Sequence, residues 1–256
     1  MTSAQARTFL RAEWRSLAIL TFEAEASLLR PFVPAGTELD QHDGRSLVSL
    51  VGFRFLKTSI LGCRVPFHEA FDEVNLRIYV RREQLGVLRL GVSFIREVVS
   101  RRLVAYLARV AYNEPYVVRR MRSEIPTGAQ VTPFRVQYAW RGERGWDSMA
   151  LTAVGSPLMP RAQSLESFVT ARAWGYSRQA DGSTLEYHVE HAPWRLWVGR
   201  EPEVRGDMGN AFGTNVGGAL STLPACVVLA EGSEVTVSRP SPISVRAPTA
   251  QVRGAA

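Results

Sequence analysis

The sequence predicts a mostly β (α+β) protein: a closed antiparallel or mixed β-barrel with short helices at its periphery. About eleven strand patterns and about four short helix patterns occur along the chain, without the regular alternation of strand and helix that a parallel sheet needs. The segments 46–56 and 146–155 are apolar on both strand faces, as expected for strands buried from two sides. These elements fit one domain better than two.

The first third of the chain alternates strand and turn signals. We expect a strand over 14–23, and then a short helix over 25–32 that prolines terminate. Asp43-Gly44 predicts a tight hairpin turn before a long strand over 46–58.

The clearest helix pattern covers 100–112, where Leu103, Leu107 and Val110 form one apolar stripe and Ser100 is the expected N-cap. A second short helix is expected over 164–170, with Ser164 as its cap. A third is expected near 209–221, before a last hairpin that turns at Glu231-Gly232. The remaining predicted strands cover 73–82, 87–98, 116–124, 131–140, 146–155, 172–179, 184–190, 194–199, 225–229 and 234–237.

Composition places the chain among ordinary globular proteins. It has 256 residues, of which 46% are hydrophobic and 21% charged, and no apolar run approaches the roughly 20 residues of a membrane span. No secretory signal is apparent, and Cys63 and Cys226 lack metal-ligand or disulfide spacing. We therefore expect a cytoplasmic protein without a membrane partner. One domain is expected over 1–238, followed by a disordered tail over 239–256 that is biased toward Pro, Ser, Ala and Arg.

The net charge of +7 raises nucleic acid or an anionic ligand as a partner. Lys57 is the only lysine among 31 basic residues, and such a preference for arginine is what a GC-rich coding bias produces. Because the arginines are scattered, we do not expect a nucleic-acid partner. Composition leaves a homo-oligomer open.

The segment FDEVNLRIYVRR (71–82) holds the strongest candidate site. At a strand's period of two, Val74, Leu76, Ile78 and Val80 form an apolar face. Glu73, Asn75, Arg77 and Tyr79 share the other face. That polar face either meets water or lines an enclosed cavity, and a closed barrel favours the cavity.

The turn after this strand decides which residues oppose Glu73. If the loop has three residues, 84–86, Glu73 lies opposite Glu97, and the two carboxyls raise one pKa as in a general acid. If the loop has two residues, Leu85-Gly86, Glu73 lies opposite Val98 instead. The sequence leaves both registers open.

A second polar cluster follows the 100–112 helix and contains Arg109, Tyr112, Asn113, Glu114 and Tyr116. It is consistent with a helix end capped by Asn113, or with a polar patch at the mouth of a barrel.

His188 and His191 lie three apart on a strand and point to opposite faces, which disfavours a metal site. His191 is expected to anchor a turn above Trp194, while His68 lies close enough in sequence to reach the polar face. Since no nucleotide, zinc-protease or serine-hydrolase motif occurs, we expect neither a cofactor nor a metal.

Five blocks of the chain are distinctive: LLRPFVPAGTELDQHDGRSLVSLVGFRF (28–55), LGCRVPFHEAFDEVNLRIYVRR (61–82), GVSFIREVVSRRLVAYLARVAYNEPY (91–116), HVEHAPWRLW (188–197) and LAEGSEVTV (229–237). Together they resemble the YqjF-like bacterial family, a domain of unknown function in the acetoacetate-decarboxylase-like superfamily. The resemblance implies a cone-shaped β-barrel with peripheral helices and an internal ligand cavity. It also implies that Glu73 matches the superfamily's active-site glutamate.

The same resemblance argues against acetoacetate decarboxylation. Acetoacetate decarboxylases carry a Lys-Lys pair after an Arg-containing run that ends in proline, and one lysine forms a Schiff base. In this chain Arg109, Tyr112 and Pro115 match that run, whereas Tyr116 and Val117 stand where the lysines would be.

We therefore expect a barrel that binds a small carbonyl or carboxylate metabolite. Glu73 and Glu97 are the predicted acid–base residues. The predicted ligand-binding residues are Arg77, Asn75, Arg109, Tyr112, Asn113, Glu114 and His68. A non-catalytic carrier or sensor on the same fold is the alternative, and a basic surface for nucleic acid is a third reading.

Overall fold

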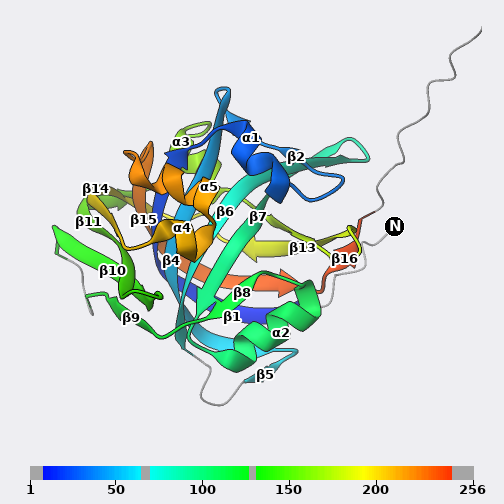
Figure 1. Ribbon diagram of the computed structural model, residues 1–256, viewed down its shortest axis with the longest axis horizontal. Helices are drawn as coiled ribbons and strands as arrows, with labels where there is room; N and C mark the ends of the chain where they lie inside the picture. The colour runs from blue at the N-terminus through cyan, green and yellow to red at the C-terminus, as the bar shows by residue number, and fades with distance from the viewer. Residues whose placement is uncertain (1–7, 65–69, 127–130, 244–256) are drawn as a thin grey trace, which may run out of the picture.

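Seven strands close into a barrel in the computed structural model, which describes residues 8–64, 70–126 and 131–243 (Figure 1). The ring, in order, consists of β1 (Thr8–Glu23), β4 (Arg45–Ile60), β6 (Phe71–Gln84), β7 (Val87–Val99), β12 (Trp174–Arg178), β13 (Thr184–His191) and β15 (Cys226–Ser238). β13 pairs with both β12 and β15, which joins the two ends of the ring. The β7–β12 pair is parallel and the other pairs of the ring are antiparallel, so the predicted closed, mixed barrel is confirmed.

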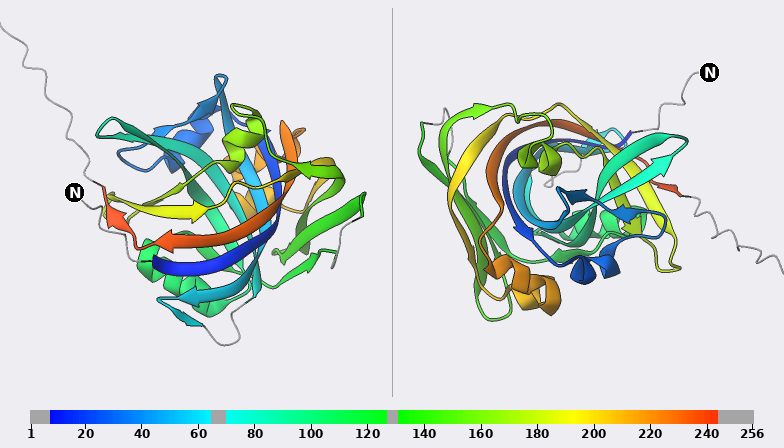
Figure 2. Two further views of the ribbon diagram at one scale, coloured as in Figure 1. Left: turned by 180° about the vertical axis from the view of Figure 1, so that it is seen from behind. Right: turned by 90° about the horizontal axis from the view of Figure 1, so that it is seen from above.

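A second group of strands extends the sheet beyond the barrel (Figure 2). Its strands, in order from β15, are β14 (Leu196–Arg205), β11 (Trp146–Leu158), β10 (Phe134–Arg141) and β9 (Met121–Glu124). The apolar strand predicted over 146–155 therefore lies between β10 and β14 and does not flank β6.

The sheet divides along β15, at Gly232. Residues 228–230 of β15 pair with β14, whereas residues 235–237 pair with β13. Gly232 has φ +82°, and a Cβ there would lie 1.9 Å from the carbonyl oxygen of Trp14. The predicted hairpin at Glu231-Gly232 is therefore wrong: one continuous strand bends where only glycine fits.

β6 separates two cores. Val74, Leu76, Ile78 and Val80 are fully buried in a cluster that also contains Tyr138 of the extension. The opposite face points into the barrel, where a second apolar cluster lies. Because both faces are covered, Glu73, Asn75 and Tyr79 of the polar face are buried, and Arg77 is partly exposed.

Short helices pack around the barrel, as predicted. α2 begins without a side-chain cap at Arg101, so the expected N-cap role of Ser100 is wrong, whereas Asn113 does form its left-handed C-cap. Ser164 accepts a hydrogen bond from the amide of Ser167, which confirms the cap of α3. The helix expected near 209–221 breaks at Gly213. The helices are α1 (Ala26–Leu29), η1 (Arg30–Phe32), α2 (Arg102–Tyr112), α3 (Leu165–Thr170), α4 (Met208–Phe212), α5 (Thr214–Gly217) and η2 (Gly218–Ser221).

Five short strands complete the structure: β2 (Glu38–Leu39), β3 (Gln41–His42), β5 (Cys63–Arg64), β8 (Tyr116–Val118) and β16 (Ser241–Pro242). The Asp43-Gly44 turn between β3 and β4 is confirmed, with both residues at positive φ. β16 pairs with β13, while 244–256, most of the predicted tail, lies outside the described residues. Within the described part of the chain, none of the helices has the length and apolar character of a membrane span.

Candidate ligand-binding site

The barrel encloses a cavity of about 130 Å³, enough space for a small organic molecule or several waters. Most of its wall is apolar and comes from β1, β4, β7 and the inner face of α2. A smaller set of polar residues faces the same space. These residues are Thr58, Glu73, Asn75, Arg77, Glu97, Tyr112, Glu114, Tyr116, Thr170, Arg172, Tyr187 and His191.

A β-bulge in β7 determines which residues of that strand face the cavity. The turn has two residues, since Gln84 pairs with Val87, but Ile95 is an extra residue between the pairs Leu76–Arg96 and Arg77–Phe94. Glu73 therefore pairs with Val99, and neither predicted register is correct, because both assumed an unbroken ladder. The bulge moves Glu97 onto the inner face, opposite Asn75 and diagonal to Glu73.

Glu73, Glu97 and Glu114 converge in the cavity wall, each at most 5% exposed. Glu73 accepts hydrogen bonds from Asn75 Nδ2 at 3.0 Å and from the Tyr116 hydroxyl at 2.9 Å. Among the described residues no arginine, lysine or histidine forms an ion pair with any of the three. The cluster is thus held by hydroxyl and amide donors without a compensating cation.

Burial governs the protonation of this cluster. It raises the pKa of Glu73 to about 7, despite the hydrogen bonds from Asn75 and Tyr116 that oppose the shift. It raises the pKa of Glu114 to about 8, against the hydrogen bond that the Tyr187 hydroxyl donates at 2.7 Å. The pKa of Glu97 lies well above its usual range, because burial and the charges of Glu114 and Glu73 all disfavour its ionised form. The cluster therefore holds protons near neutral pH.

Arginines occupy the other end of the polar face. Arg77 donates from Nη2 to the Val169 carbonyl at 2.9 Å, and Arg172 forms a buried ion pair with Asp40 at 2.5 Å. Both guanidiniums lie against the ring of Tyr79, at 5.8 and 5.0 Å from its centroid. The cavity therefore has an acidic end and a basic end, separated along β6 by Asn75.

The structure brings six of the predicted site residues to the cavity and places two others outside it. Glu73, Asn75, Arg77, Glu97, Tyr112 and Glu114 line it. Arg109 is not among the lining residues, because its guanidinium donates to the backbone carbonyl of Tyr116. Asn113 is likewise outside, since it caps α2 and donates to the Arg178 carbonyl at 2.8 Å. His68 lies outside the described residues.

The sequence did not indicate Arg172, which lies between α3 and β12, or Tyr187, which lies in β13. Nothing near Arg172 marks it as a site residue. Tyr187 could have been found from the period of two in β13, which places it on the same strand face as His191. His191 bonds to the Ala192 carbonyl and stacks on Trp194 with centroids 4.1 Å apart, as expected for a turn anchor.

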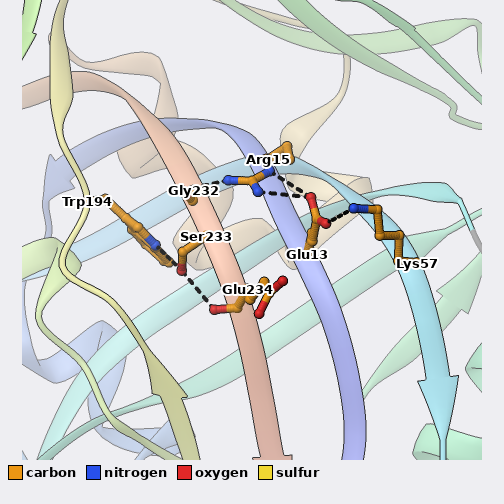
Figure 3. Close-up of polar contacts among 7 residues, drawn as sticks. All are labelled: Glu13, Arg15, Lys57, Trp194, Gly232, Ser233 and Glu234. Atoms are coloured by element: carbon orange, nitrogen blue, oxygen red, sulfur yellow. Dashed lines mark hydrogen bonds and ion pairs between the residues drawn. The ribbon is translucent and has the colours of Figure 1, made fainter.

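Lys57 lies outside the cavity. Its ammonium pairs with Glu13, which Arg15 also contacts, and its side chain is 74% exposed (Figure 3). The same figure shows Trp194 donating to the Ser233 hydroxyl on the neighbouring strand. Since Lys57 is the only lysine, the cavity contains no amine that could form an imine with a ligand.

No three His, Cys, Asp or Glu side chains among the described residues are placed to hold a metal ion. The polar groups that line the cavity include carboxyls, hydroxyls, an amide and guanidiniums, which donate or accept hydrogen bonds.

Comparison with known sequences agrees with the resemblance found above. A family model described as an uncharacterized conserved protein, DUF2071, matches residues 11–234. The uncharacterized protein YqjF of Bacillus subtilis (strain 168) is 26% identical over 192 residues, which is 73% of this chain and 74% of YqjF.

Solved structures share the fold at low sequence identity. Acetoacetate decarboxylase from Legionella pneumophila superposes with a TM-score of 0.66 at 12% identity, covering 92% of this chain and 87% of that one. The enduracididine biosynthesis enzyme MppR, complexed with pyruvate, superposes with a TM-score of 0.63 at 11% identity, covering 96% and 94%. At these identities the likeness is one of fold.

Proposed function

The chain belongs to the DUF2071 family of uncharacterized conserved proteins, and from that premise we propose that its barrel cavity binds a small organic metabolite. The observation that carries this proposal is the cluster of Glu73, Glu97 and Glu114 in a mostly apolar wall. Burying a carboxyl without a cation is unfavourable, and such groups concentrate where a protein binds or transforms a ligand.

The proposed ligand carries a carbonyl or carboxylate group that Arg77 orients. Arg77 lines the cavity, and no carboxylate among the described residues forms an ion pair with it. A guanidinium in that position favours a planar anionic partner. The complex of MppR with pyruvate is an example of a related barrel that holds a small keto acid.

Glu73 is the proposed proton donor or acceptor for this ligand. With a pKa raised to about 7, it exchanges protons efficiently near neutral pH, and no arginine holds it in the ionised form. A carrier or sensor is the second candidate, favoured by the absence of an imine-forming lysine from the cavity.

A thermal-shift screen with a metabolite mixture tests the binding proposal. The wild type, Arg77→Ala and the surface control Arg200→Gln are compared. A ligand at about 100 times its Kd stabilises by about 2.7 kcal/mol, so the wild type and the control are expected to gain roughly 5–10 °C. Arg77→Ala is expected to lose most of that gain. Equal stabilisation of all three proteins by the same ligand contradicts the assignment of the site.

Hydrogen–deuterium exchange separates the enzyme from the carrier. A bound ligand with acidic C–H bonds is incubated with the protein in D₂O and followed by proton NMR. If Glu73 acts as a base, the wild type catalyses exchange, and Glu73→Gln loses it while the ligand still binds. No exchange above the protein-free rate assigns the carrier role.

A further inference from the structure

Buried polar atoms without a hydrogen-bond partner concentrate around the cavity. Nine such side-chain atoms occur among the described residues, and six belong to residues that line it. They are Trp14 Nε1, Thr58 Oγ1, Asn75 Oδ1, Arg77 Nε, Glu97 Oε2 and Arg172 Nη2. Because buried polar groups are nearly always satisfied in folded proteins, this concentration indicates groups that a ligand completes.

The free atoms at the acidic end are an amide oxygen, which accepts, and a carboxyl oxygen, which accepts once that carboxyl is ionised. Asn75 donates from Nδ2 to Glu73, which leaves its carbonyl oxygen as the free atom. Glu97 lies directly opposite Asn75 in the ladder and has its Oε2 free. The hydroxyls nearby are already used, since Tyr116 donates to Glu73 and Tyr187 to Glu114. This end therefore calls for a ligand group that donates hydrogen bonds.

The free atoms at the basic end are donors. Arg77 uses Nη2 for the Val169 carbonyl and leaves Nε free, whereas Arg172 uses Nη1 for Asp40 and leaves Nη2 free. Arg77 follows Asn75 by two residues on the same strand face, which separates their Cα atoms by about 7 Å. This end calls for an acceptor, and two guanidiniums favour a carboxylate.

We propose that the ligand is bifunctional, with a carboxylate at Arg77 and Arg172 and an amine at Asn75 and Glu97, spanning the two-residue step of about 7 Å between Arg77 and Asn75 along β6. This inference rests on the proposed function of the cavity and names the ligand class. An ammonium group supplies three donors, which match Asn75 Oδ1, Glu97 Oε2 and a glutamate oxygen of the cluster. An ammonium also supplies the positive charge that the three glutamates lack. Since the empty cluster holds protons, such a ligand displaces them on binding.

Calorimetry with a homologous series tests the ligand class. The probes are ω-amino acids from glycine to 6-aminohexanoate, each compared with the alkyl carboxylate and the alkylamine of the same length. We expect 5-aminovalerate, whose two charged groups lie about 6–7 Å apart, to bind at least about tenfold more tightly than pentanoate or pentylamine. Titration at pH 7 in buffers of different ionisation enthalpy is expected to show proton release, about one per ligand.

Two variants assign each end of the ligand. In Glu97→Gln, pentanoate is expected to bind as tightly as 5-aminovalerate, because the preference for the amine is lost. In Arg77→Gln, pentylamine is expected to match 5-aminovalerate. The surface variants Glu124→Gln and Arg200→Gln are expected to keep the wild-type preference. The wild-type series remains decisive even if one cavity variant does not fold.

The outcomes separate this inference from the proposed function. If pentanoate or keto acids bind the wild type as tightly as the amino acids, and Arg77→Gln weakens them, the cavity binds ligands and the bifunctional class is wrong. The proposed function is wrong as well if no compound of the series or of the metabolite mixture binds the wild type. It is also wrong if both cavity variants bind the ligands as the wild type does.

Discussion

Glu73, Glu97 and Glu114 lose nearly all of their hydration in the folded chain, and hydroxyl and amide groups replace only part of it. An uncompensated ionised carboxyl in such a wall is strongly disfavoured, so each group shifts its pKa and binds a proton instead. At the scale of single residues, the three carboxyls therefore bind protons near neutral pH, and their net charge changes with the pH and with the bound ligand.

The protonation of these three glutamates predicts that the stability of the fold depends on pH. In the folded state the three pKa values lie above the usual value for glutamate, so the folded chain binds more protons than the unfolded chain. The contribution of these groups to the free energy of unfolding is fully present below about pH 4.5, where both states are protonated. It decreases as the pH rises from there through 7 and 8, by up to about 1.4 kcal/mol per pH unit for each group.

Urea unfolding at pH 5 to 8 measures this loss. Glu97→Gln removes one of the three groups and is expected to reduce the slope relative to the wild type, while the exposed control Glu124→Gln keeps it. A slope that Glu97→Gln leaves unchanged shows that Glu97 is ionised in the folded protein, contrary to this account.

Lys57 gives a prediction about chemistry. Because its ammonium faces Glu13 and solvent, borohydride reduction of the protein with a keto acid is expected to leave the intact mass unchanged. A stoichiometric adduct that disappears in Lys57→Arg would mean that this lysine enters the site.

At the scale of elements, the β6–β7 hairpin builds the acidic end. Between Glu73 and Val80, β6 alternates its side chains between two faces, which line two different interiors. β7 reverses its alternation at the Ile95 bulge, so Phe94 and Glu97 both face the cavity although they are three residues apart. Without that bulge, Glu97 would point toward the apolar core behind β6.

β15 depends on one glycine in the same way. Gly232→Ala places a methyl group against the Trp14 carbonyl in a backbone conformation that side chains rarely adopt. We expect it to lower the free energy of unfolding by about 2–4 kcal/mol. Gly86→Ala, at a similar φ of +76° but with open space around it, is the matched control and is expected to cost about 1 kcal/mol. Equal losses in chemical denaturation would show that Trp14 does not restrict the bend.

At the scale of the whole molecule, short sequence segments determine some parts of the structure, and contacts between segments far apart in the chain determine others. The strand periods and the tight turn at Asp43-Gly44 follow from short segments, and the structure has them as such. For the turn at Leu85-Gly86 and the cap at Asn113 the sequence left an alternative open, and the structure decides between them. The Ile95 bulge has no local sequence signal, so the register of Glu97 was not predictable. The glycine at 232 is typical of a hairpin turn, but it is equally typical of a bend inside one strand. Arg172 and Tyr187 reach the cavity only through tertiary pairing.

The closed ring and its strand extension together make the polar face of β6 a cavity wall. The extension covers the apolar face, so the polar residues have no route to water on that side. Closure of the ring by β13 and β15 then encloses them. A wall of this kind is expected to be occupied by a ligand that matches its free donors and acceptors.

The most direct test is a crystal structure of the protein with the metabolite that gives the largest thermal stabilisation. We predict ligand density inside the barrel, within hydrogen-bond distance of Arg77 Nε and Glu97 Oε2. Density on the outer surface, together with a cavity that contains only water, would contradict the assignment of this cavity as the functional site.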